Sequence, residues 1–148
     1  MNKEQLRKEI LQKLIYPKKI PLSVVLNELS PAEFTLIASF KSYEKSNEGK
    51  HITVNELASN INISVPAVSK TLKKLEDRGL IQRITNKECR RNTFVVISEK
   101  GEDLYRYNKE KITLVLDKLM SSFSIEEIQA AISFYQKLEN IINKEYTL

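Results

Sequence analysis

The chain has 148 residues, of which 41% are hydrophobic and 29% charged, with a formal net charge of +5 and one cysteine. These totals fit a single globular domain that can bury a core, and they exclude an internal disulfide. No apolar run approaches the roughly 18 to 20 residues of a membrane span, and the charged N-terminus is unlike a secretory signal, so we expect a cytoplasmic protein with no membrane partner.

Helix starts are the clearest local signals along the chain. Capping boxes, in which a hydroxyl and a glutamate three residues later satisfy the first backbone N–H groups, are expected at Ser30/Glu33, Thr53/Glu56 and Ser124/Glu127. Ser64 and Ser98 are weaker starts, and Gly79 is expected to end a helix in the left-handed conformation with Leu80 packed behind it. We predict helices over 3–15, 31–46, 54–60, 65–78, 99–121 and 125–144, recovered helix over 22–29 after Pro17 and Pro21, an extended piece at 51–52, and a hairpin of strands 81–85 and 93–97.

Residues 54–78 are predicted to form two short helices joined by a tight turn. One apolar set can close a small core, namely Leu57, Ala58, Ile61, Ile63, Val65, Val68, Leu72 and Leu75. Small residues lead the opposite face of the second helix and lysines follow, which suits a helix that enters the major groove of DNA and pairs with phosphates. The alternative is a helical hairpin whose basic face is only solvated. The outward residues are Pro66, Ala67, Lys70, Lys73 and Lys74, with Ser64 before them and Ser69 at the flank.

The excess positive charge lies in one segment. Residues 64–92 hold eight basic side chains and three acidic ones, so this segment carries the whole net charge and the rest of the chain is balanced. The stretch NKECRRN, residues 86–92, supplies Lys87, Arg90 and Arg91 at the tip of the predicted hairpin. Arginine is drawn into the narrow minor groove by its negative potential, so this tip is predicted to contact DNA there.

These motifs resemble the MarR family of bacterial transcriptional regulators. The resemblance rests on Val54-Asn55-Glu56-Leu57-Ala58, Ser64-Val65-Pro66-Ala67-Val68-Ser69-Lys70, Leu75-Glu76-Asp77-Arg78-Gly79-Leu80-Ile81 and Ile97-Ser98-Glu99-Lys100-Gly101. It implies a mainly α fold with a small β-hairpin wing: an N-terminal dimerisation region over 1–30, a winged helix-turn-helix domain over 31–100 and C-terminal dimerisation helices over 101–148. It also implies a homodimer that binds a palindromic operator, represses transcription and is released by a small-molecule effector.

The wing departs from the family pattern at Cys89. The family has an aspartate and an arginine here; Arg91 takes the place of the arginine, and Cys89 takes that of the aspartate. A neutral thiol cannot hold a guanidinium as a carboxylate does. Cys89 is therefore either a simple replacement, which we favour, or a thiolate favoured by its arginine neighbours that oxidation would convert into a switch.

Other classes of function find little support in the sequence. No glycine-rich phosphate loop, nucleophile elbow or acid pair is present, so we expect no enzyme and no cofactor. His51 and Cys89 are the only histidine and cysteine, so we expect no metal site. The competing hypotheses are a winged-helix protein-interaction module and an architectural DNA-binding protein without sequence choice. Apolar stripes on the terminal helices either cover one intramolecular core or form a dimer interface.

Overall fold

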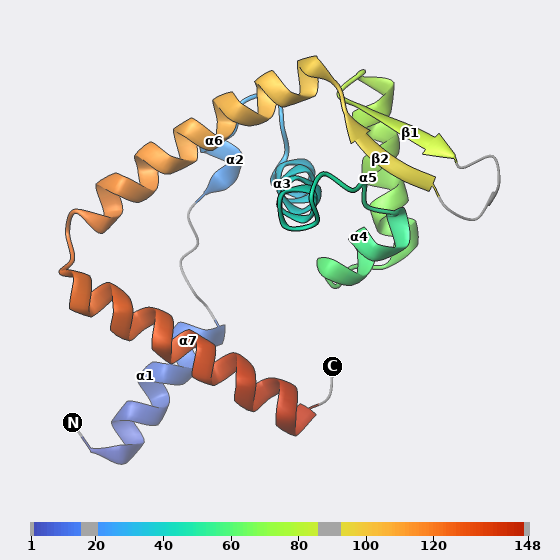
Figure 1. Cartoon of the computed structure of the whole chain (residues 1–148). Coiled ribbons are helices and arrows are strands. Elements are labelled where there is room, and N and C mark those ends of the chain that lie inside the picture. Colours follow the sequence, from blue (N-terminus) through green and yellow to red (C-terminus); the bar gives the residue numbers. More distant parts are fainter. Residues whose placement is uncertain (1, 16–20, 86–92, 147–148) are drawn as a thin grey trace.

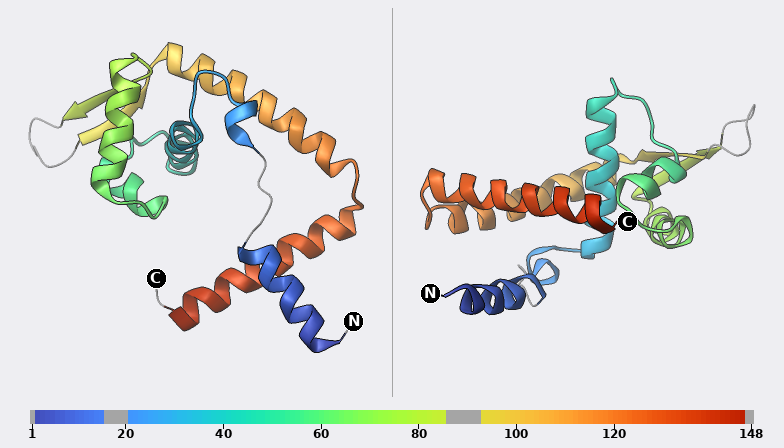
Figure 2. Two further views of the ribbon diagram at one scale, coloured as in Figure 1. Left: turned by 180° about the vertical axis from the view of Figure 1, so that it is seen from behind. Right: turned by 90° about the horizontal axis from the view of Figure 1, so that it is seen from below.

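The computed structural model describes residues 2–15, 21–85 and 93–146 and confirms a mainly α fold with a small β-hairpin (Figure 1). A helix-turn-helix with its hairpin lies at one end of a wide arc, and the two long C-terminal helices form the rest of the arc (Figures 1 and 2). The elements in chain order are α1 Lys3–Ile15, α2 Leu22–Val25, α3 Pro31–Ser46, α4 Val54–Asn60, α5 Val65–Asp77, β1 Ile81–Thr85, β2 Thr93–Ile97, α6 Glu99–Met120 and α7 Ile125–Tyr146.

The predicted caps are confirmed in their hydrogen bonds. Both directions of the capping box are present at α3, at α4 and between Ser124 and Glu127. Gly79 has φ +70°, its N–H donates to the Glu76 carbonyl at 2.8 Å, and the Leu80 N–H donates to the Leu75 carbonyl at 2.9 Å. This is the Schellman motif, so α5 ends where its glycine predicts.

The expected helix over 22–29 is wrong, because α2 ends at Val25. Leu26 is already extended, Glu28 has φ +56°, and Leu26 and Leu29 turn into the interior at 9% and 5% exposure. The fully buried Asn108 of α6 holds the backbone between them, accepting from the Asn27 N–H at 2.7 Å and donating to the Asn27 carbonyl at 3.0 Å. Tertiary contacts thus override local helix propensity here.

The core lies between α3, α4, α5 and the hairpin. Phe40, Leu57, Leu72, Leu80 and Val95 are each 0% exposed at its centre. The expectation that Ile63 and Val65 join this core is wrong, since they are 48% and 41% exposed. The buried stripe of α5 starts only at Val68, because Val65 is the first residue of the helix and projects beyond the elements that pack against it.

The hairpin pairs its strands antiparallel, with Ile81 opposite Ile97 and Thr85 opposite Thr93. The predicted extended piece at 51–52 joins its edge, since the Val95 N–H donates to the Ile52 carbonyl at 3.1 Å and Thr53 bridges Phe94. These bonds tie the segment before α4 to the wing.

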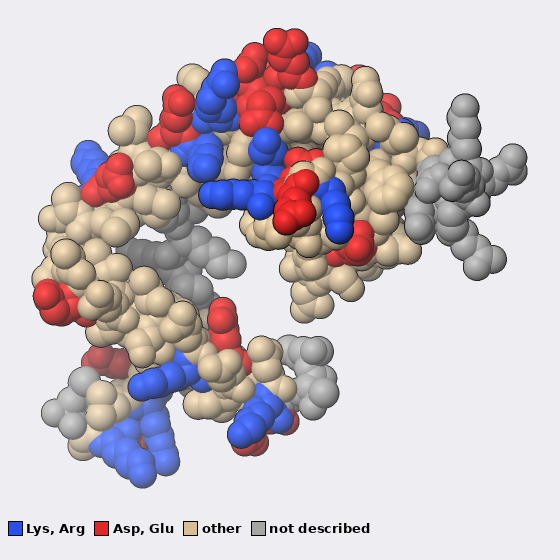
Figure 3. Space-filling view, viewed as in Figure 1, with Lys and Arg blue, Asp and Glu red and all other residues tan. Residues whose placement is uncertain are grey.

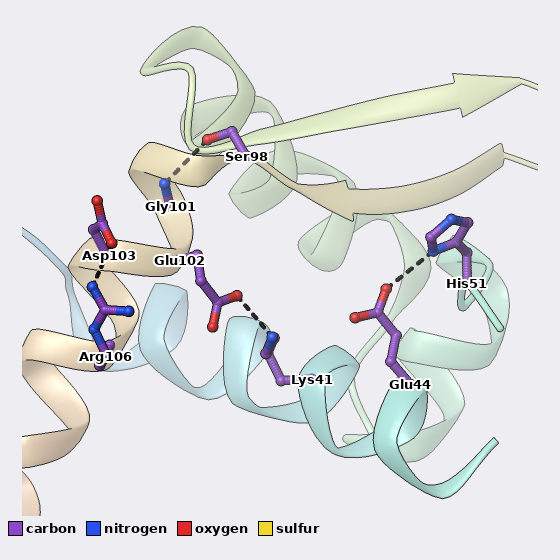
Figure 4. A network of polar contacts seen from close by, with 8 residues as sticks. All are labelled: Lys41, Glu44, His51, Ser98, Gly101, Glu102, Asp103 and Arg106. Atoms are coloured by element: carbon purple, nitrogen blue, oxygen red, sulfur yellow. Dashed lines mark hydrogen bonds and ion pairs between the residues drawn. The ribbon is translucent and has the colours of Figure 1, made fainter. Parts of the chain in front are cut away.

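The start of α6 is locked against the turn after α5. The Ser98 hydroxyl donates to the Gly79 carbonyl at 2.7 Å and accepts from the Gly101 N–H at 3.1 Å (Figure 4). The Ser98 N–H donates to the Leu80 carbonyl at 3.0 Å. A side chain at Gly101 has no space, because an added Cβ would lie 2.1 Å from the Leu80 carbonyl oxygen.

The outer helices expose much of their apolar surface. On α1, Leu6 and Ile10 are 43% and 45% exposed, and on α7, Ile132 and Tyr135 are 53% and 57% exposed. The alternative in which the terminal helices cover one intramolecular core is therefore wrong for the described residues. Among the helices that the structure describes, none is long and apolar enough to cross a membrane.

Gly101→Ala should destabilise the fold by about 1–3 kcal/mol, because the added methyl group meets a backbone oxygen that is itself hydrogen-bonded. Gly49→Ala is a comparison of the opposite kind: Gly49 has φ +78° but nothing within 4 Å of an added Cβ, so it reports a conformational cost that the helical Gly101 does not carry. Urea unfolding monitored by circular dichroism compares the two. A Gly101→Ala variant as stable as the unmodified protein would show that the close approach at Gly101 does not matter.

Candidate nucleic-acid interface

The outward side of α5 carries the predicted DNA-contacting residues of the helix. Val68, Leu72 and Leu75 are buried, so the helix rotates its other side to solvent. Ser69 is half-buried at the edge of this surface. The exposed residues are Ser64, Pro66, Ala67, Lys70, Lys73 and Lys74.

Ser64 differs from the other residues that precede helices. Ser30, Thr53 and Ser98 each accept a hydrogen bond from the backbone of the helix they start. The Ser64 side chain makes no such bond, although its backbone is extended as an N-cap requires. Its hydroxyl is therefore available to a ligand, beside the first N–H groups of α5, which lack partners within a helix.

Two of the arginines in the basic segment are held by acidic side chains. Arg78 Nη1 lies 3.3 Å from Glu33 Oε1, and a second nitrogen of Arg78 donates to the Glu28 carbonyl. Arg83 donates from Nε and Nη2 to Glu76 Oε2, at 2.9 Å and 2.5 Å. These arginines brace α5 against α3 and β1, which the charge count alone did not reveal.

The three lysines of α5 carry the remaining described positive charge of this segment. Within the described residues, Lys70, Lys73 and Lys74 take part in no ion pair. The face of α6 shown in Figure 3 differs, since basic and acidic side chains alternate along it. The Lys41–Glu102 pair, 2.7 Å between Nζ and Oε2, belongs to this mixed surface (Figure 4).

The wing tip predicted to enter the minor groove lies outside the described residues. This applies to Lys87, Cys89, Arg90 and Arg91, which follow Thr85 and precede Thr93. The described strands place Thr85 and Thr93 opposite each other, so the segment between them leaves and returns at one end of the hairpin.

Aromatic side chains of α3 and α6 are occupied with packing between these helices. Phe34 stacks on Tyr105 with 5.4 Å between ring centroids, and Phe40 is fully buried. Burial raises the pKa of the Tyr105 hydroxyl. His51 makes a 3.0 Å contact with Glu44, and in the part of the chain that the structure describes, no three metal-ligating side chains gather (Figure 4).

Comparison with known proteins connects this geometry to a family. The model of the MarR family matches residues 46–93, which span α4, α5 and β1 and end at the first residue of β2. Over 92 residues the chain is 27% identical to YdgJ, an uncharacterised HTH-type transcriptional regulator of Bacillus subtilis strain 168. The match covers 62% of this chain and 56% of that relative, a little over half its length.

Solved structures share the fold over a longer stretch. A MarR family protein from Bacillus stearothermophilus superposes with a TM-score of 0.68 at 21% identity, covering 97% of this chain and 99% of that one. A mutant MarR from Escherichia coli in complex with operator DNA gives a TM-score of 0.65 at 19% identity, covering 79% of each chain. The comparisons match regulators, which agrees with the expectation of a non-enzyme.

Hydrogen bonds from Arg83 hold the pKa of the Glu76 carboxyl below its usual value. The folded state therefore gains stability above the unfolded-state pKa and loses it as pH falls through the lower folded-state pKa. In thermal unfolding between pH 6 and pH 3, Glu76→Gln should flatten the loss of stability seen in the unmodified protein. Asp103→Asn, which removes the exposed pair with Arg106, serves as control. An unchanged profile in Glu76→Gln would show that this pair does not stabilise the fold.

Proposed function

We propose that this chain, a MarR-family transcriptional regulator with a DNA-binding winged-helix fold, is a repressor that binds a palindromic operator as a homodimer. The observation that carries the proposal is the exposed side of α5, where small residues lead and three lysines without described ion pairs follow. Occupation of an operator by such a dimer would keep transcription machinery from the same DNA.

In this proposal α5 lies in the major groove. The groove is about 12 Å wide and admits a helix whose leading residues are small. Lys70, Lys73 and Lys74 then pair with phosphates, which fix the orientation of the helix and contribute affinity. The Ser64 hydroxyl and the first N–H groups of α5 add contacts of the kind that helix starts make to phosphate.

The wing is proposed to reach the minor groove through Arg90 and Arg91, with Lys87 on the nearby backbone. This part of the proposal rests on the sequence and on the hairpin that presents residues 86–92. Two routes of release remain within the proposal, a small-molecule effector and oxidation of Cys89. Either signal would have to favour a conformation in which the two copies of α5 in the dimer no longer match the spacing of the operator.

Alanine substitution of Lys70, Lys73 or Lys74 should weaken DNA binding, because fewer phosphates are then neutralised. It should also lower the slope of log affinity against log salt by about 0.9 for each phosphate that no longer pairs with a lysine. Fluorescence anisotropy with a labelled duplex at four salt concentrations measures both quantities.

The control for the lysine variants is Lys109→Ala, an exposed lysine in the first half of α6. It should leave the salt slope unchanged. Retention of affinity and slope in all three α5 variants would contradict the placement of α5 against DNA. The same titrations separate the competing functions, because an architectural protein shows no preference between sequences and a protein-interaction module shows no binding.

The homodimer is proposed from the exposed surface of the chain. Its solvent-accessible area is 11677 Å². A compact monomer of 17.1 kDa exposes roughly 7,800 Å². The excess far exceeds the roughly 800 Å² per partner buried at a standard interface. A two-fold dimer would also set two copies of α5 at the roughly 34 Å spacing of successive major grooves.

The exposed apolar side chains of the outer helices identify where the partner would pack. They occur on α1, on the second half of α6 and on α7, away from the helix-turn-helix (Figure 2). The most exposed are Leu11, Leu114, Phe123, Ile125, Ile132, Tyr135 and Ile141.

Light scattering coupled to size exclusion should report a dimer at micromolar concentration. Ile132→Glu should weaken association at least about tenfold, because it places a charge without a partner in the proposed interface. Gln129→Glu introduces the same charge on an exposed polar position of α7 and should remain dimeric. A monomeric unmodified protein would contradict the dimer and, with it, the reading of a palindrome.

A further inference from the structure

The leading end of α5 is apolar and open to solvent. Val65 is 41% exposed, and Pro66 beside it is also exposed. Their neighbours Ile63 and Ala67 line a hollow together with Pro31 and Ala32, so they face the start of α3. Val65 and Pro66 line no part of that hollow. The structure therefore leaves two adjacent apolar side chains at the leading end of the helix that the proposed function places in the major groove.

The rest of α5 offers few groups that read base edges by paired hydrogen bonds. Arginine and lysine make such contacts to guanine, and asparagine and glutamine make them to adenine; of these four residue types the helix, VPAVSKTLKKLED, contains only lysine. Glu76, which could accept from cytosine, is held by Arg83. Thr71 donates its hydroxyl to the Ala67 carbonyl at 3.2 Å. Recognition of A·T base pairs by α5 must therefore draw largely on another kind of contact.

We propose that Val65 and Pro66 are specificity-determining residues that select the operator by packing against the C5-methyl groups of thymines in the major groove. This inference rests on the proposed function. Thymine is the only base with a methyl group on the major-groove edge, and apolar side chains recognise it by contact. Transfer of one such group from water into an apolar contact changes affinity about fourfold.

Duplex DNA fits this surface better than an apolar partner does, because of the charges that accompany it. Lys70, Lys73 and Lys74 follow the apolar pair along the exposed side of the same helix, and among described residues none of them is in an ion pair. A surface with cations beside an apolar end complements a groove in which phosphates border the base edges. A protein partner would need carboxylates in the same arrangement.

The test replaces thymines by deoxyuridine, which removes only the methyl group. An operator is first selected from random duplexes with the full-length protein, and each thymine is then replaced singly. We expect about fourfold weaker binding at the thymines under α5 and no change at thymines outside the footprint. The scan uses the unmodified protein, so its outcome does not depend on the folding of a variant.

Variants then assign the contacts to residues. In Val65→Ala and in Pro66→Ala, replacing one particular thymine by deoxyuridine should weaken binding by less than about twofold, because the side chain that contacted its methyl group has been removed. This loss of affinity on removal of a methyl group is called the methyl effect below. Val24→Ala, which truncates an 80% exposed valine of α2, should retain every methyl effect. Circular dichroism of each variant establishes that the fold is intact.

The outcomes separate this inference from the function on which it rests. Binding that is indifferent to every deoxyuridine overturns methyl reading while leaving a DNA-binding regulator in place. Methyl effects that persist equally in Val65→Ala, Pro66→Ala and the unmodified protein overturn the assignment to these residues. Failure to select any duplex overturns the proposed function and this inference together.

Discussion

The packing of the Leu80 carbonyl against Gly101 is the constraint on which the rest of the architecture depends. Three elements meet there: α5 has just ended, the hairpin is about to begin, and α6 starts after the hairpin returns. Gly79 turns the chain out of the helix, and Ser98 binds that turn from the other side. Because Gly101 lacks a side chain, α6 approaches closely enough to be held in a fixed direction relative to α5.

That fixed direction gives α6 a mechanical role. The helix runs from the base of the hairpin to α7, so in the proposed dimer a change in the packing of the outer helices would act on α5 and the hairpin through it (Figure 1). Asn108 adds a second attachment along its length, where it holds the backbone of Asn27 between α2 and α3. Lys41 and Glu102 join α3 to the same helix. In the proposed regulator, changes would pass through rigid elements that touch at these few places.

The basic side chains divide into two groups by chemistry. Arg78 and Arg83 each make several hydrogen bonds to oxygens of other elements, which suits the planar guanidinium with its several donors. The three lysines of α5 are exposed to solvent, and their side chains are long and flexible. Such side chains can adjust to the positions of phosphates when the helix enters a groove, as proposed above. Two of the eight basic side chains in residues 64–92, Arg78 and Arg83, therefore stabilise the fold. Among the described residues of this segment, the three lysines of α5 remain for the DNA contacts proposed above.

The sequence was enough to predict every described helix start and the two strands of the hairpin. The capping boxes and Gly79 are local signals, because each involves residues only a few positions apart in the chain. The early end of α2, the exposure of Ile63 and Val65, and the pairing of Glu33 with Arg78 were decided only by tertiary structure. In the first and last of these cases the deciding group lies far along the chain: Asn108 is 81 residues from Asn27, and Arg78 is 45 from Glu33. Periodicity identifies which side of a helix is apolar, whereas burial also requires another element to be present there.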